Sequence, residues 1–136
     1  MQYYFMINAK LPSLNEYINA CRANKYQAAI FKRDVEELIG WAIIEAKSKK
    51  MLQPICKPVI VKIDFYEKTK RRDVDNIIAG GSKVILDTLV NHKIIKDDSR
   101  KYVKQVHCDV YDSDRDYAIV TLCEYFEKDI DNKSQQ

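Results

Sequence analysis

The spacing of apolar residues changes along this chain, and that change constrains the fold more than any other feature of the sequence. Between residues 27 and 50, apolar side chains recur every three or four positions. These positions are Phe31, Val35, Leu38, Ala42 and Ala46. Such spacing predicts one long amphipathic helix. Lys57–Tyr66 is rich instead in β-branched and aromatic residues, which predicts a strand.

The remaining segments complete a mixed pattern of helices and strands. We expect a strand at Gln2–Lys10, a short helix from Leu14 to about Lys25, a helix from Asp75 to about Asn91, and strands at Tyr102–Tyr111 and Tyr117–Phe126. The polar residues 112–116 predict a hairpin turn between the last two strands. The order β-α-α-β-α-β-β predicts an α+β domain, a small mixed β-sheet with helices packed on one face.

Length and composition predict one soluble domain. A chain of 136 residues with 46% hydrophobic residues has the length and the apolar content of a single core. We assign residues 1–127 to this domain and expect the polar residues 128–136 to form a disordered tail. The sequence contains no apolar run long enough for a membrane span and no signal peptide, so we expect a cytoplasmic protein. The four cysteines lie far apart, which favours buried, reduced thiols.

The sign of the charge reverses abruptly between the predicted strand and the helix that follows it. Residues 67–72 contain four cations, Lys68, Lys70, Arg71 and Arg72, although the net charge of the chain is only +3. Clustered cations favour contact with a polyanion such as a nucleic acid, because they release its counterions. A solvated loop is the alternative interpretation.

Two acidic pairs are the candidate metal ligands. Asp73 and Asp75 follow the basic run at once, and in extended backbone their carboxylates point the same way, as a hard cation such as Mg²⁺ requires. Capping of the helix is the alternative. Asp97 and Asp98 come after the same helix and approach the first pair if the helix doubles back on the preceding strand. An ordinary turn is the alternative there.

Two further features belong to the helix that begins near Asp75. Gly80-Gly81 interrupts it, which calls for close approach of a backbone or a partner helix, a kink, or a later helix start. Lys83 follows and is able to reach a phosphate, or to remain a surface lysine. The chain has no phosphate-binding glycine loop and no zinc-ligand spacing, so nucleotide and zinc chemistry lack support.

Three motifs together resemble the RusA-type Holliday junction resolvases. They are Arg71-Arg72-Asp73-Val74-Asp75-Asn76, then Ile85-Leu86-Asp87-Thr88-Leu89, then Ile95-Lys96-Asp97-Asp98-Ser99. The N-terminal Leu11-Pro12-Ser13-Leu14-Asn15-Glu16-Tyr17 is also similar to the opening turn of that family. The resemblance extends over nearly the whole chain.

The resemblance implies an endodeoxyribonuclease, frequently phage-borne, that acts as a homodimer in DNA recombination and repair. It would cut two opposed strands of a four-way junction with one or two Mg²⁺ ions, for which Mn²⁺ is a possible substitute. The catalytic and metal-binding aspartates carry over to Asp73, Asp75 and Asp98, with Asp97 as the alternative to Asp98.

The resemblance also places residues around these aspartates. Counting back from Asp87 puts the catalytic lysine at Lys83. Counting forward from Asn76 puts that position at Ala79 instead, because the stretch between Asn76 and Asp87 is about one helical turn longer than in the best-known members of the family. The predicted DNA contacts are Lys68, Lys70, Arg71, Arg72, Asn15 and Asn76.

Two other functions remain open from the sequence. One is a nuclease of the same build that prefers flaps, forks or other branched DNA. The other is a catalytically inert module that binds DNA junctions, in which the aspartates serve as caps and turns. None of the three functions requires a nucleotide cofactor or a membrane.

Overall fold

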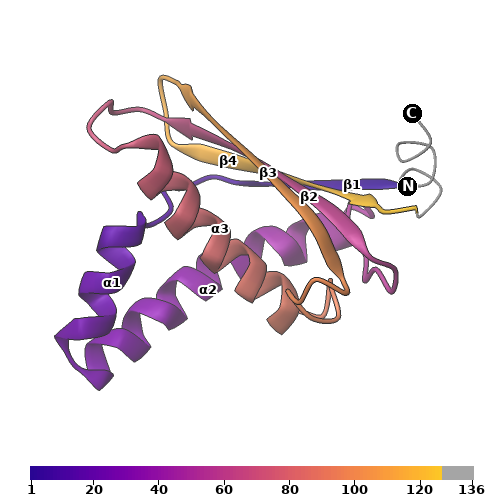
Figure 1. The fold of residues 1–136 in the computed structure, drawn as a ribbon, viewed down its shortest axis with the longest axis horizontal. Helices are drawn as coiled ribbons and strands as arrows, with labels where there is room; N and C mark the ends of the chain where they lie inside the picture. Colours follow the sequence, from indigo (N-terminus) through magenta and orange to yellow (C-terminus); the bar gives the residue numbers. More distant parts are fainter. Residues whose placement is uncertain (127–136) are drawn as a thin grey trace.

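A computed structural model describes residues 1–126 of the chain, and it has the predicted α+β architecture (Figure 1). The elements are β1 (Gln2–Ile7), α1 (Leu14–Ala23), α2 (Lys25–Ser48), β2 (Val59–Glu67), α3 (Val74–Asn91), β3 (Val103–Asp112) and β4 (Tyr117–Glu124). Their order confirms the prediction. The predicted tail, residues 128–136, lies outside the described residues.

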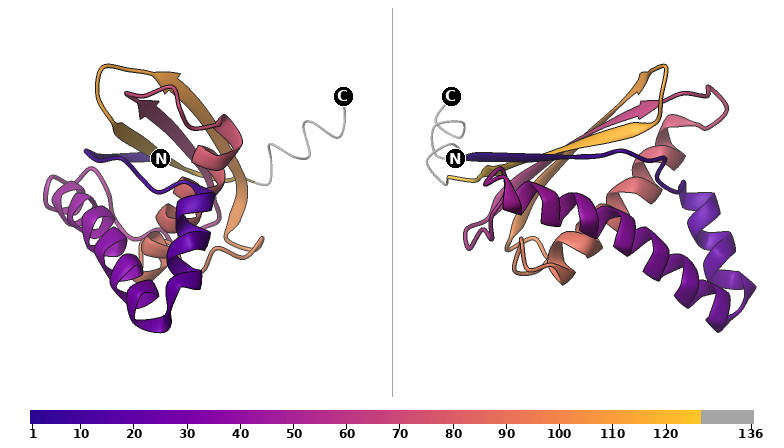
Figure 2. Two further views of the ribbon diagram at one scale, coloured as in Figure 1. Left: turned by 90° about the vertical axis from the view of Figure 1, so that its left-hand side faces the viewer. Right: turned by 180° about the vertical axis from the view of Figure 1, so that it is seen from behind.

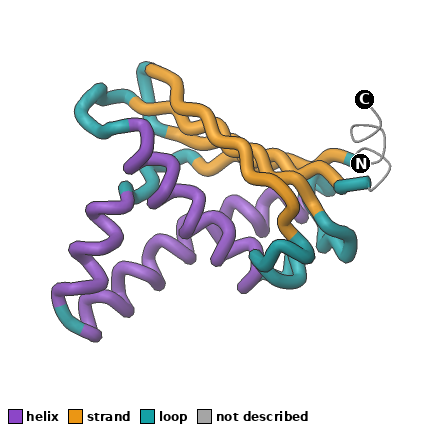
Figure 3. Tube along the Cα trace, in the orientation of Figure 1, coloured by secondary structure: helices purple, strands orange, loops and turns teal. Residues whose placement is uncertain are grey.

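The four strands form one mixed sheet in the order β1-β4-β2-β3. β2 pairs in parallel with β3 and antiparallel with β4, while β4 pairs antiparallel with β1. All three helices lie on one side of this sheet (Figures 2 and 3). The core forms between the two layers, and its fully buried side chains include Phe5, Ile39, Ile63, Ile85 and Leu122.

The predicted hairpin between the last two strands is wrong. β3 and β4 are not neighbours, because β2 lies between them. The connection crosses the end of β2, where the Ser113 N–H donates to the Glu67 carbonyl (2.9 Å) and the Lys68 N–H donates to the Asp116 carboxylate (2.8 Å). A short linker can cross one strand, since adjacent strands lie only about 4.8 Å apart.

Side-chain caps set where the first two helices begin. The Ser13 hydroxyl accepts from the Glu16 N–H (3.2 Å), which caps the start of α1, and it donates to the Glu16 carboxylate (3.1 Å). Asn24 alone separates α1 from α2, and its side chain accepts from the Gln27 N–H (2.7 Å). The long helix therefore begins two residues earlier than its apolar period predicts.

The two glycines of α3 permit close packing on both sides of the helix. A Cβ on Gly80 would overlap the backbone of residues 12–14, and one on Gly81 would overlap the ring of Phe65 on β2. Of the predicted explanations, close approach of a backbone is therefore confirmed for Gly80. Both glycines are buried within their own chain, which leaves neither available to a partner helix.

We expect Gly80→Ala to destabilise the fold by about 1–3 kcal/mol, because backbone atoms of residues 12–14 cannot move aside easily. Gly40→Ala in α2 is the matched control. Its Cβ would meet only the His92 imidazole, at 2.7 Å from Nε2, and a side chain can rotate away. Urea unfolding of both variants tests this. Equal stability of the two would show that α3 does not approach residues 12–14 so closely.

No helix within residues 1–126 is both long and apolar enough to cross a membrane. All four cysteines are free. Cys21, Cys108 and Cys123 are half-buried, but Cys56 is exposed, so the expectation that all four are buried is wrong for Cys56.

Candidate functional site

The first acidic pair lies in the first turn of α3. Asp73 occupies the N-cap position in extended conformation, yet its side chain makes no capping hydrogen bond. Asp75 is the second residue of the helix, and both carboxylates are exposed. The capping interpretation therefore does not describe Asp73 in this structure. The start of α3 therefore carries two exposed carboxylates, and the Asp73 carboxylate caps no backbone N–H.

A depression of about 210 Å³ next to Asp73 joins residues that are far apart in the sequence. It is lined by Ser13, Asn15, Glu16, Arg71, Arg72, Asp73 and Asn76. Asn15 comes from α1, Asn76 from α3, and the arginines from the β2–α3 loop. The structure thus brings four of the predicted DNA-contact residues to the first predicted aspartate.

Arg72 has a role that the sequence did not indicate. Its guanidinium contacts the Glu67 carboxylate (2.8 Å), the Glu16 carboxylate (3.0 Å) and the Leu11 carbonyl (2.8 Å). The side chains of Arg72 and Glu67 are only 10% and 6% exposed. This ion cluster joins the end of β2 to α1 and to the segment before it.

The prediction that Arg72 contacts DNA does not fit this arrangement, because its charge is already paired inside the fold. Lys68, Lys70 and Arg71 remain exposed on the same loop. Lys70 has one weak partner, Asp112 at 3.8 Å, and both of those side chains are mostly in solvent. Three of the four loop cations are therefore accessible to a polyanion.

Glu16 is the acidic residue of this depression that the predictions missed. Burial alone would raise the pKa of its carboxyl, but hydrogen bonds from Arg72 and Ser13 outweigh burial and hold the pKa below its usual range. Glu16 is therefore ionised as part of the Arg72 cluster. The capping-box spacing Ser13-x-x-Glu16 was the sequence signal for its position, but not for its contact with Arg72.

Lys83 lies further along α3 and is paired with another side chain of that helix. Its ammonium contacts the Asp87 carboxylate at 3.3 Å. The hydrogen bond and the charge of Asp87 raise the pKa of Lys83, with smaller contributions from Tyr17 and Asp98. The four-residue spacing could have predicted the Asp87 pair. Lys83 follows Asp75 by eight positions, which is about 12 Å along the helix axis. The alternative position, Ala79, is half-buried between them.

The second acidic pair lies at the other end of α3. Asp97 and Asp98 line a depression of about 280 Å³ with Asp87, Val90 and Asn91 of the last turns. Because α3 has 18 residues, its two ends are roughly 27 Å apart. The expectation that this loop approaches Asp73 and Asp75 is therefore wrong within one chain. The helix runs away from the basic loop rather than returning to it (Figure 1).

These placements decide which metal sites fit the chain. Within the described residues, no group of three or more acidic, histidine or cysteine side chains is arranged to hold a metal. A site built from Asp73, Asp75 and Asp98 of one chain does not fit. Asp75 lies within the helix, so the extended backbone that was expected to point both carboxylates the same way is absent. Mg²⁺ commonly takes one or two carboxylates together with water and substrate phosphate oxygens, and the exposed Asp73 and Asp75 are available as such ligands.

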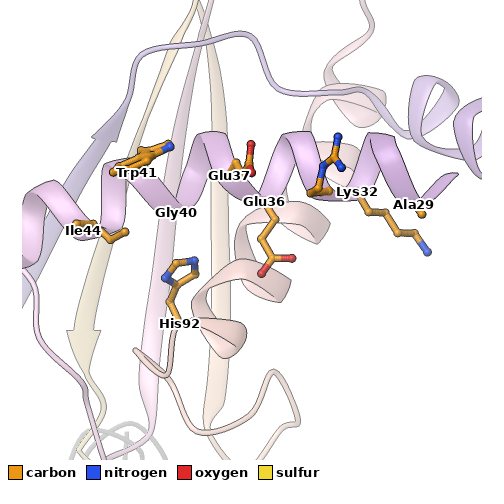
Figure 4. Close-up of a pocket in the computed structure, with 9 residues that line it drawn as sticks. Ala29, Lys32, Glu36, Glu37, Gly40, Trp41, Ile44 and His92 are labelled. Atoms are coloured by element: carbon orange, nitrogen blue, oxygen red, sulfur yellow. The ribbon is translucent and has the colours of Figure 1, made fainter. Parts of the chain in front are cut away.

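A larger depression lies remote from these residues. It has a volume of about 580 Å³ and lies along the outer side of α2 (Figure 4). Trp41 and Ile44 border it, and the His92 ring projects toward Gly40 from the end of α3. None of the residues predicted for catalysis or DNA contact lines it.

Comparisons with known proteins add no assignment to this geometry. The chain matches no protein-family model and no curated protein sequence.

Proposed function

We propose that this chain is a Mg²⁺-dependent, structure-selective endodeoxyribonuclease that resolves four-way DNA junctions as a homodimer in the cytoplasm. Its role would be in DNA recombination and repair, as the resemblance to the RusA-type resolvases implies. The observation that carries the proposal is the exposed pair Asp73 and Asp75 at the start of α3, beside a basic loop.

The charges around this pair suit a phosphodiester substrate. Two carboxylates alone would repel a DNA backbone, and neighbouring cations must offset them. Lys68, Lys70 and Arg71 supply that positive charge and would position the backbone without reading its sequence. Asn15 and Asn76 add neutral hydrogen-bonding groups in the adjacent depression.

Asp73 and Asp75 would hold Mg²⁺ in this proposal, and the ion when bound would supply Lewis-acid stabilisation of charge at the scissile phosphate. The chain's own contribution is to present two exposed carboxylates at the start of α3. Lys83 would add positive charge further along the same helix, although its present partner is Asp87.

A second candidate function has an observation in its favour. Asp98 lies at the far end of α3 from Asp73 and Asp75, so one chain lacks the three-carboxylate site that the family resemblance implies. A DNA-junction-binding module without cleavage needs only the basic loop and the depression beside it. Cleavage assays distinguish this module from the nuclease.

The proposal predicts Mg²⁺-dependent, paired symmetric nicks in a synthetic four-way junction with fixed arms. Linear duplex of the same sequence should remain uncut, because it lacks the branched geometry. Replication forks and 5′ flaps complete the panel. Denaturing gels of end-labelled strands, with Mg²⁺ and with EDTA, give the measurement.

Each outcome of this panel has a definite meaning. Preferential cutting of flaps or forks would replace the junction with another branched substrate. Tight junction binding without cutting in Mg²⁺ or Mn²⁺ would refute the nuclease and support the binding module. Cutting that persists in EDTA would refute the metal.

A further inference from the structure

The side of the sheet that faces away from the helices is uncovered by the described part of the chain (Figures 1 and 2). We call it the open face. Its side chains alternate with the buried ones along β1, β2 and β4. In β1, Tyr3 and Phe5 are buried, whereas Tyr4 and Met6 are 52% and 42% exposed. An uncovered sheet face with large apolar residues is a candidate interaction surface.

The register of the strands arranges the open face in rows that run across the sheet. One row holds Tyr4, Thr121, Lys62 and His107. The next row along the strands holds Met6, Ile119, Asp64 and Asp109. A basic row therefore lies directly beside an acidic row. Lys62 and His107 lie on the same two strands, β2 and β3, as Asp64 and Asp109.

The acidic row is uncompensated within the described residues. Asp64 and Asp109 are direct neighbours on β2 and β3, and like charges in that position repel. Neither forms an ion pair within residues 1–126, and the Oδ1 atom of Asp64 is sealed from water without a hydrogen-bond donor. Burial and these two carboxylates raise the pKa of Cys108 to about 11. Positive charge from a partner would complement these two carboxylates.

The basic row offers that charge on the same surface. Lys62 is exposed and also has no ion-pair partner within residues 1–126. The His107 ring lies beside Lys62 on the neighbouring strand, with its Nε2 atom 2.8 Å from the Gln105 side-chain oxygen, and its tautomer decides which ring nitrogen donates. The open face thus carries an acidic row without ion-pair partners and, next to it along the strands, a row with Lys62 that could pair with such carboxylates.

We propose that the open face is the interface with a second copy of this chain. The two-fold axis would lie in the interface, perpendicular to the strands, between the basic and the acidic row. This operation exchanges the two rows, so that Lys62 faces Asp64 of the second copy and His107 faces Asp109 of the second copy. Each contact occurs twice, as an isologous interface requires.

The same axis also matches the apolar part of the face. Tyr4 comes to face Met6 of the second copy. The row Tyr117, Tyr66 and Tyr111 comes to face the row Cys123, Ile60 and Gln105. The two sheets would pack face to face with aligned strands, an arrangement typical of β-sandwiches.

A nucleic acid is a poorer match for this face. The acidic row would repel phosphates. The rings of Tyr66 and Tyr117 stack with centroids 4.3 Å apart, and those of Tyr66 and Tyr111 with centroids 5.1 Å apart. Arg115 covers the outer side of Tyr117 at 4.5 Å from its centroid. The inner ring faces are therefore occupied and cannot stack on bases.

This assignment rests on the dimer that the proposed function includes, but not on its chemistry. The open face lies on the opposite side of the sheet from α1 and α3 (Figure 2). Pairing through it would leave Asp73, Asp75 and the basic loop of both copies exposed to DNA. Oligomeric state and cleavage can consequently be measured separately.

Charge-swap variants of the full chain test the interface by sedimentation equilibrium. One variant carries Lys62→Asp with His107→Asp, and the other carries Asp64→Lys with Asp109→Lys. Each alone should raise the dimer dissociation constant by about 100-fold or more, because like charges then oppose each other across the axis. An equimolar mixture should form heterodimers, because the acidic face of one variant meets the basic face of the other.

A control variant and milder substitutions keep the test decisive. Trp41→Glu changes the other exposed apolar surface, where Trp41 is 69% exposed on α2, and should leave the dimer intact. Far-ultraviolet circular dichroism checks folding. If a double variant unfolds, Asp64→Asn and Asp109→Asn should still weaken the dimer, by about tenfold, since they keep side-chain shape.

Several results would overturn the interface. These are a monomeric wild-type chain, dimerisation that the charge swaps do not weaken, a mixture that stays monomeric, or dissociation by Trp41→Glu. Junction cleavage by the same samples separates the two proposals. Cleavage by a monomeric wild type would reject the interface and leave the chemistry standing, whereas a swap-sensitive dimer that never cuts would reject only the nuclease.

Discussion

Asp75→Asn should abolish junction cleavage while leaving junction binding intact or tighter. The substitution keeps the shape of the side chain but removes one of the two carboxylates at the start of α3. We expect a loss on the order of 100- to 1,000-fold in cleavage rate, as when one group that stabilises transition-state charge is removed. Binding should hold or improve, because a negative charge next to a phosphate is gone. Single-turnover cleavage and gel-shift titration measure the two effects.

Asp34→Asn is the matched control for this experiment. It makes the same change of charge on the exposed surface of α2, far along the chain from the basic loop. Its cleavage rate should equal that of the wild type. Asp75→Asn should cost less than about 1 kcal/mol of folding free energy, the value of one charge at a helix end. An Asp75→Asn protein that is folded and still cuts normally would remove this residue from the active site.

The kinds and order of the elements could be predicted from the sequence because they depend on local periodicity. The three-and-four spacing in α2 and the β-branched run in β2 each bury one side of their own element, wherever the neighbours lie. Gly80 and Gly81 also carried usable information, since two glycines inside a helix indicate close packing. What they pack against, residues 12–14 and Phe65, depends on the tertiary fold.

Strand pairing could not be predicted in the same way. The alternation in β3 and β4 fits a hairpin as well as it fits separation by β2, because a strand's pattern does not identify its neighbour. The polar residues between them suit a turn and equally suit a crossing. The sheet order is set by β2, which is buried along most of its length and pairs on both edges.

The candidate site shows the same division between local and long-range information. Asp73 and Asp75 are two residues apart, so the sequence alone was sufficient to place both at the start of α3, but the helical backbone of Asp75 departs from the extended backbone that the sequence prediction assumed. The position of Asp98 depends on the direction of the chain after α3, and the structure places it beside Asp87 instead. The basic loop was visible as a cluster of four cations, but only the fold distinguishes the buried Arg72 from exposed Arg71.

Arg72→Ala should destabilise the fold by about 3–5 kcal/mol, the usual cost of removing one partner of a buried ion pair. The substitution would leave Glu67, which is 6% exposed, without its cation, and would leave the Leu11 carbonyl without its donor. That loss is a large share of the 5–15 kcal/mol by which a domain of ordinary stability is folded. Urea unfolding followed by circular dichroism measures it.

Arg71→Ala is the control that separates burial from charge. It removes one cation from the same loop, but its side chain is exposed, so stability should change by less than about 0.5 kcal/mol. Arg72→Met combined with Glu67→Met should recover part of the loss, because no buried carboxylate is then left unpaired. Equal, small losses for both alanine variants would mean that Arg72 is not held as described. Arg72 would then be available to DNA, as its sequence neighbours first suggested.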